Sequence, residues 1–176
     1  FYAVPQTCPL MLICVFAVSL VIVGCGPSAE KQQRKDLAKA VQRHDTAEVK
    51  RLLEAGVDPD EVSVSGGFFG APFGRRPILH YVADSNSDKA YEILELLLEW
   101  GADPNRTSAG ATALHRALYN RQSNDLIRLL LDNGADVNAR NQSGRTPLEI
   151  AVNRGYSDTA ALLKSYGAHR GGGRQD

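Results

Sequence analysis

Apolar side chains recur along most of the chain at the three- and four-residue spacing that is typical of amphipathic helices. Four of these runs end at a glycine, and helices commonly end where a glycine adopts a positive φ angle. These glycines are Gly56, Gly101, Gly134 and Gly167. The last two intervals between them are 33 residues long, whereas the first is 45 residues long. The pattern predicts a repeated helical unit, with twelve residues inserted between the first and second copies.

The segments that begin these units are also alike. Residues 146–151 read TPLEIA, residues 112–117 read TALHRA, and residues 77–82 are a looser copy that reads PILHYV. Thr112 and Thr146 are placed to cap the first helix of a unit. One such unit cannot bury its own apolar face, so we expect the units to stack and share a core.

Caps are also predicted at the start of the second helix of each unit. Asp45 with Glu48 resembles a capping box. The corresponding positions of the later units are Ser87, Ser123 and Ser157, each with an aspartate nearby.

The two motifs, T-P-L-H-x-A at the start of a unit and L-L-L-x-x-G-A-D-x-N at its end, resemble the ankyrin repeat, whose period is about 33 residues. The resemblance covers residues 36–168. It implies an all-α solenoid of about four helix-turn-helix repeats with projecting hairpin loops. It also implies a protein that binds another protein through its loop tips and first helices, and that is not an enzyme. Residues 169–176 are rich in glycine and are expected to form a flexible tail.

The first part of the chain differs in composition from the rest, because no charged residue precedes Glu30. Residues 10–23 are apolar apart from Ser19. This run is shorter than the roughly 20 residues of a transmembrane helix and matches the apolar region of a secretory signal peptide. We therefore predict a signal peptide rather than a permanent membrane span.

The residues that follow, Ile22-Val23-Gly24-Cys25, resemble the lipobox of bacterial lipoprotein precursors. The resemblance implies that residues 1–24 are a signal peptide that is removed, that Cys25 is lipidated, and that residues 25–35 form a tether. Gly26, in place of an aspartate, implies sorting to the outer membrane of the cell envelope, on its periplasmic face. A signal peptide that is cut elsewhere and a retained membrane anchor are the alternatives. The chain starts at Phe1 and has no basic residue before the apolar run, which a missing upstream segment would explain.

Charge and motif content narrow the chemistry. The chain has 20 basic and 20 acidic side chains, a balance that argues against binding of duplex nucleic acid. All three cysteines lie in the leader or at its end, so the repeats hold no cysteine-based metal site or catalytic thiol. His80 and His115 occupy the histidine position of the repeat motif, where the resemblance implies a structural hydrogen bond. No catalytic residue, metal or cofactor is predicted.

The insertion, which lies within residues 63–76, is the most distinctive loop of the sequence. It is rich in glycine and carries three of the five phenylalanines, and insertions into ankyrin proteins often lie on the binding face. The alternative is that these phenylalanines fold back over the first repeats. The predicted partner-binding residues are Phe68, Phe69, Phe73, Arg75 and Arg76 in the insertion, and Arg106, Arg140 and Asn141 at other hairpin tips.

Together, these features predict a monomeric lipoprotein of the bacterial envelope that binds a protein partner. An immunity protein that neutralises a secreted toxin is the specific version of this hypothesis. The alternative is an envelope scaffold with several weaker partners.

Overall fold

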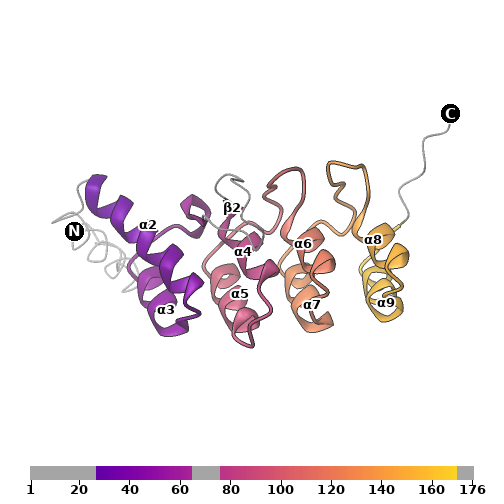
Figure 1. The fold of residues 1–176 in the computed structure, drawn as a ribbon, viewed down its shortest axis with the longest axis horizontal. Coiled ribbons are helices and arrows are strands. Elements are labelled where there is room, and N and C mark those ends of the chain that lie inside the picture. The colour runs from indigo at the N-terminus through magenta and orange to yellow at the C-terminus, as the bar shows by residue number, and fades with distance from the viewer. Residues whose placement is uncertain (1–26, 65–75, 170–176) are drawn as a thin grey trace, which may run out of the picture.

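The computed structural model describes residues 27–64 and 76–169, which form a row of four helix pairs (Figure 1). The first helices of the pairs are α2 (Pro27–Gln42), α4 (Ile78–Asp84), α6 (Ala113–Tyr119) and α8 (Pro147–Asn153). The second helices are α3 (Thr46–Glu54), α5 (Ala90–Glu99), α7 (Asn124–Asp132) and α9 (Ser157–Ser165). The first helices form one layer and the second helices form the other, in sequence order from one end to the other. The predicted all-α solenoid of four repeats is therefore confirmed.

Packing between neighbouring pairs makes the core. Helix α4 packs on α6 and α6 packs on α8, while the second helices follow one another in the same order. Ala117 and Ala151 are fully buried in the first-helix layer, where their small side chains allow neighbouring helices to approach closely. The larger side chains of this core include Leu37, Leu53, Ile93, Leu94, Leu97, Leu114, Leu118, Leu130 and Leu148.

The insertion begins and ends in a short strand pair. Strand β1 (Ser63–Val64) pairs antiparallel with β2 (Arg76–Pro77), and a 3-10 helix, η1 (Pro59–Glu61), precedes β1. Residues 65–75 lie outside the described residues. So do four of the predicted partner-binding residues and the predicted lipidation site, namely Phe68, Phe69, Phe73, Arg75 and Cys25.

The first repeat begins earlier than its sequence motif suggests. Helix α2 starts at Pro27, so most of the segment that we expected to be a tether is helical. Glu30 lies in the first turn, where a carboxylate complements the helix dipole, and Arg34 forms an ion pair with Glu61 of η1. The polar composition of this segment reflects an exposed helix surface rather than an extended chain. None of the helices within residues 27–64 and 76–169 is long and apolar enough to cross a membrane.

The capping predictions hold at the first helices. The Thr146 hydroxyl accepts a hydrogen bond from the Glu149 amide at 3.3 Å, and the Glu149 carboxylate accepts one from the Thr146 amide at 2.9 Å. At the preceding repeat, His115 takes the place of the glutamate. Its Nδ1 accepts hydrogen bonds from the amide of Thr112 at 3.3 Å and from its hydroxyl at 2.8 Å.

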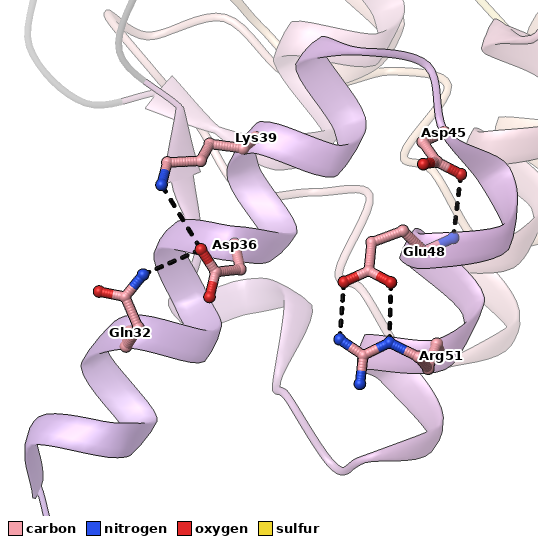
Figure 2. Close-up of polar contacts among 6 residues, drawn as sticks. All are labelled: Gln32, Asp36, Lys39, Asp45, Glu48 and Arg51. Carbon is pink, nitrogen blue, oxygen red and sulfur yellow. Dashed lines mark hydrogen bonds and ion pairs between the residues drawn. The ribbon is translucent and has the colours of Figure 1, made fainter.

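At the second helices the capping predictions hold only in part. Ser123 caps α7, and Asp45 caps α3 through the Glu48 amide at 3.1 Å. Glu48 does not complete the capping box, because its carboxylate binds Arg51 instead (Figure 2). Ser157 is the first residue of α9, one position after the N-cap, and the hydroxyl of Ser87 accepts from the Lys89 amide in a turn before α5, so these two caps were wrongly predicted.

The four repeated glycines end the second helices as predicted. Each has a φ angle between 84° and 88°, which is unfavourable for residues with a Cβ. The amide two residues beyond each helix's last residue, such as Gly134 after Asp132, donates back into the last turn.

Side chains of one repeat also bond to the backbone of the next. Nε2 of His80 donates to the carbonyl of Ala111 at 2.8 Å, and Nε2 of His115 donates to the carbonyl of Arg145 at 3.2 Å. Asn105 donates to the Gly134 carbonyl at 2.9 Å in the same direction along the stack. The predicted structural role of the two histidines is confirmed.

Burial lowers the pKa of both His80 and His115, despite the opposing effect of their hydrogen bonds to backbone carbonyls. The hydrogen bonds of His115 also favour the neutral imidazole, because its Nδ1 accepts from Thr112 and a proton on that atom would displace these bonds. The neutral imidazole is therefore the form that holds neighbouring repeats together.

We expect the free energy of unfolding to fall as the pH is lowered below about 6.5, the ordinary pKa of histidine. In that range the two histidines take up protons in the unfolded chain but not in the folded chain. Above it they are neutral in both. The loss approaches about 1.4 kcal/mol per pH unit for each histidine until its folded-state pKa is reached. Urea unfolding between pH 7.5 and pH 5.5, about one unit either side of that pKa, measures it.

The variant His115→Gln should show a shallower fall over the same pH range, because only one buried histidine remains. Stability that is constant or that rises on acidification would contradict the assignment.

Candidate protein-binding surface

An ion-pair cluster joins repeats 2 and 3 on the side of the first helices. Asp84, the last residue of α4, accepts a hydrogen bond from Arg76 at 2.5 Å and pairs with Arg116 of α6 at 3.1 Å. Its second carboxylate oxygen accepts from the Asn120 amide group at 2.6 Å. The side chains of Arg76, Asp84 and Arg116 are only 13%, 21% and 30% exposed. One carboxylate is thus held by two guanidinium groups in a half-buried position.

Tyr119 extends this surface from repeat 3 to repeat 4. Its hydroxyl accepts a hydrogen bond from Asn141 of the hairpin loop before α8 at 2.7 Å. The guanidinium of Arg154, at the end of α8, lies 5.1 Å from the centre of the tyrosine ring and donates to the Tyr119 carbonyl at 2.9 Å. A loop and the far end of a helix are therefore linked through one aromatic side chain.

A second arginine–tyrosine pair lies beside the first, at the turns between first and second helices. The guanidinium of Arg121 lies 5.8 Å from the centre of the Tyr156 ring. A cavity of about 370 Å³ opens next to this pair, between repeats 3 and 4, and is lined mainly by polar side chains. Among the described residues, no three histidine, cysteine, aspartate or glutamate side chains come close enough together to hold a metal ion.

The hairpin loops of repeats 3 and 4 touch each other. A Cβ at Gly110 would come within 2.8 Å of the Cβ of Gln142 and within 2.9 Å of its backbone nitrogen. Glycine at this position, with a φ angle of 70°, allows the two loops to lie side by side. The surface of repeats 3 and 4 is consequently continuous from the loops to the helix ends.

The family model for ankyrin repeats, in three copies, matches residues 79–170, which include helices α5 to α9 and nearly all of α4. The chain belongs to the ankyrin-repeat family. Two mammalian relatives of this ankyrin-repeat protein are both named cyclin-dependent kinase 4 inhibitor B. The protein of Bos taurus is 35% identical over 133 residues, which are 74% of this chain and 90% of the relative. The protein of Rattus norvegicus is 33% identical over 130 residues, which are 72% of this chain and 88% of the relative.

Membership in this family indicates a module for protein–protein interaction, in agreement with the coarse functional prediction. The described partner-binding candidates of this ankyrin-repeat protein make contacts within the fold. Arg76 binds Asp84, and Arg106 donates to the backbone carbonyl of Asp60 and pairs with its carboxylate at 3.6 Å. The guanidinium groups of Arg76 and Arg106 therefore already bind oxygen atoms within the fold.

Arg140 and Asn141 lie together in the loop before α8. The side-chain oxygen of Asn141 accepts from the amides of Ser143 and Arg145, so this side chain shapes the loop. Arg140 is exposed and donates to the Gly144 carbonyl at 2.7 Å, which leaves further N–H groups of its guanidinium directed at solvent. A contact of either residue with a partner stays a prediction.

Sequence reasoning missed Arg116, Arg121, Tyr119, Arg154 and Tyr156. It concentrated on loop tips, whereas these residues lie on the first helices or in the turns that lead to the second helices. One signal could have found the arginines, because residues 106–154 contain seven arginines and no lysine. The pairing of arginine with tyrosine could not have been found, since it joins residues of different repeats.

Asp84→Ala is expected to destabilise this ankyrin-repeat protein by about 2 kcal/mol. The change removes the carboxylate that two half-buried arginines share. The matched control is Glu48→Ala, which removes the exposed ion pair with Arg51 shown in Figure 2 and should leave the unfolding midpoint nearly unchanged. Urea unfolding measures both, and equal effects of the two substitutions would contradict a special role for Asp84.

Proposed function

We propose that this ankyrin-repeat protein binds one partner protein through the first-helix side of repeats 2 to 4, together with the insertion. The observation that carries the proposal is the continuous array of arginine, tyrosine and asparagine side chains that runs from the Asp84 cluster through Tyr119 to Arg121 and Tyr156. Tyrosine and arginine are enriched at the energetically dominant positions of protein interfaces.

The internal contacts of this array favour binding, because they fix side chains before a partner arrives. Tyr119 is held at its hydroxyl by Asn141 and at its ring by Arg154. Ordering a mobile side chain at an interface costs roughly 0.5–1.5 kcal/mol, and a preformed arrangement avoids much of that cost. A rigid array of this kind suits one partner of matching shape.

We further propose that a lipid on Cys25 tethers the protein to a membrane of the bacterial envelope, with the outer membrane as the expected location. The support is the lipobox-like segment that ends at Cys25. Helix α2 starts at Pro27, so only Gly26 separates it from the lipidated residue. The first repeat would then lie close to the membrane, and the last repeats would lie farthest along the stack.

Blocking the activity of the partner is the mode of action that we favour, with the protein acting as a monomer. The mammalian relatives are named as inhibitors of a kinase, which supports inhibition as a use of this repeat array. Neutralisation of a secreted toxin is the specific version of the proposal. A protein kinase related to cyclin-dependent kinase 4 is the second candidate partner, and a scaffold with several partners is the alternative function.

Affinity capture with the full chain in detergent tests the binding proposal. We expect one dominant partner from envelope or secreted fractions, bound in a one-to-one complex. A copy with residues 66–74 replaced by a short turn should bind it at least about tenfold more weakly, because the β1–β2 pair lets the insertion be removed at its base. Arg128→Ala, on the opposite layer, is the matched control and should bind normally.

Several weak partners would favour the scaffold, and binding of purified cyclin-dependent kinase 4 would favour the kinase inhibitor. A chain that captures no protein would overturn the binding proposal.

Metabolic labelling with palmitate tests the tether separately. In a bacterial host we expect label on the wild-type chain and on Cys14→Ser, and none on Cys25→Ser, since only Cys25 follows the lipobox-like segment. The Cys25→Ser protein should also leave the membrane fraction after cleavage at another site or remain as uncleaved precursor. Label that persists on Cys25→Ser would show that the tether is wrongly assigned.

A further inference from the structure

We propose that the partner contributes a carboxylate-rich segment, which binds the exposed arginines on the first-helix side of repeats 3 and 4. These four residues, the arginine strip, are Arg121, Arg140, Arg145 and Arg154. The inference rests on the proposed protein-binding function and names the chemistry of the partner's contact.

The arginine strip is contiguous because other side chains connect its members. Arg154 lies over the ring of Tyr119, and the hydroxyl of the same tyrosine meets Asn141, the neighbour of Arg140. At the other end, Arg121 lies over Tyr156, two residues beyond Arg154. Tyr119 therefore lies between Arg154, at the end of α8, and the loop that carries Arg140.

The guanidinium groups of the strip retain donors for a ligand. An arginine that stacks on an aromatic ring uses the face of its guanidinium, and the N–H groups at its edge stay in the plane for hydrogen bonds. Arg121 and Arg154 are both exposed in this arrangement, and Arg154 donates to the Tyr119 carbonyl through Nη1. A carboxylate matches the remaining edge of such a group with two parallel hydrogen bonds.

The fold already contains one such interaction next to the strip. One carboxylate oxygen of Asp84 pairs with Arg76 and Arg116, and the other accepts a hydrogen bond from Asn120. Asn120 is the residue between Tyr119 and Arg121, so the internal carboxylate lies at the edge of the strip. A partner carboxylate would find the same kinds of donors on the neighbouring arginines, where the chain supplies no carboxylate of its own at hydrogen-bonding distance among the described residues.

Charge is distributed unequally between the two layers of helices. The second helices carry eight acidic residues, of which Glu92, Glu99, Asp125 and Asp132 are among the exposed ones, and four basic residues, Lys50, Arg51, Arg128 and Lys164. On the first-helix side of repeat 4, Glu149 is occupied by its hydrogen bond to the Thr146 amide. The strip thus attracts an acidic segment more strongly than the second-helix layer does, because acidic residues outnumber basic ones there.

The cavity beside Arg121 does not fit as the site of the carboxylates. Asp158 lines it, and a second negative charge there would be unfavourable. The acidic segment is therefore placed across the strip, over first helices that are spaced about 8–10 Å apart. An extended segment of about eight residues, roughly 27 Å long, is long enough to contact the arginines of both repeats 3 and 4.

A protein carboxylate fits better than a nucleic-acid phosphate. The chain as a whole has no net charge, and the acidic second-helix layer lies behind the strip. Nucleic-acid binding without base recognition depends on a broad excess of positive charge, which this protein lacks.

The test uses the full chain in uncharged detergent and a fluorescent peptide of about ten residues with alternating glutamate and glycine. The comparison probes are the same peptide with glutamine in place of glutamate, and polyuridylate. The inner variant carries Arg121→Glu, Arg140→Glu and Arg154→Glu. The outer variant carries Lys50→Glu, Arg128→Glu and Lys164→Glu, which changes the net charge equally at exposed positions of the second helices. Circular dichroism verifies that both variants are folded, and a third chain with glutamine at the three inner positions replaces the inner variant if it is not.

We expect the glutamate peptide to bind the wild-type chain and the outer variant with affinities within about twofold of each other. The inner variant should bind at least about tenfold more weakly, and added salt should weaken all binding. Equal loss in the two variants, equal binding of the glutamine peptide, tighter binding of polyuridylate, or no binding at all would each overturn the inference.

The same variants separate this inference from the proposed function. A captured partner that binds the inner variant as well as the wild-type chain overturns the carboxylate assignment and leaves protein binding intact. Failure to capture any partner overturns the proposed function, while the peptide measurement still decides whether the strip binds carboxylates.

Discussion

No helix pair of this protein can bury its apolar face alone, and every other feature of the fold depends on that constraint. The pairs stack so that each covers the next, and small residues such as Ala117 and Ala151 allow the helices to approach. The stack then needs fixed spacing, which His80 and His115 provide through hydrogen bonds to the following repeat. A buried polar bond of this kind is favourable only where the geometry is kept, so it specifies register as well as adding stability.

Stacking also decides which surface is available for function. The apolar faces of the helices are buried between repeats. The first helices and hairpins of repeats 2 to 4 still expose polar side chains to solvent. There the arginines fall into two groups, those held by the fold at Asp84 and Asp60 and those left exposed beside tyrosines. The first group fixes the surface, and the second group is free to meet a ligand. A binding function follows from this division more directly than from any single residue.

Local chemistry explains where prediction from the sequence succeeded. The glycines at helix ends and the threonine caps depend on residues within one turn, so a motif of a few letters is sufficient to locate them. Ser157 lies one position past the N-cap of α9 and Ser87 lies in the turn before α5, so neither caps its helix. Residues 27–35 of α2 were expected to be a tether because their polar composition shows no clear apolar period. The contact of Arg76 with a partner was predicted from the composition of the insertion, and that of Arg106 from its place at a hairpin tip, without knowledge of the carboxylates that face them.

The sequence by itself determined the family, the number of repeats, the position of the insertion and the structural role of the two histidines. These properties recur in phase, and a period is visible in one dimension. Only the tertiary structure decided which arginines are paired and which are open, because their partners come from other helices, as far as 46 residues away for Arg106 and Asp60. Such pairs depend on the rotation and translation that relate each repeat to the next. These set the distances between side chains of different repeats, and they cannot be read from the order of residues.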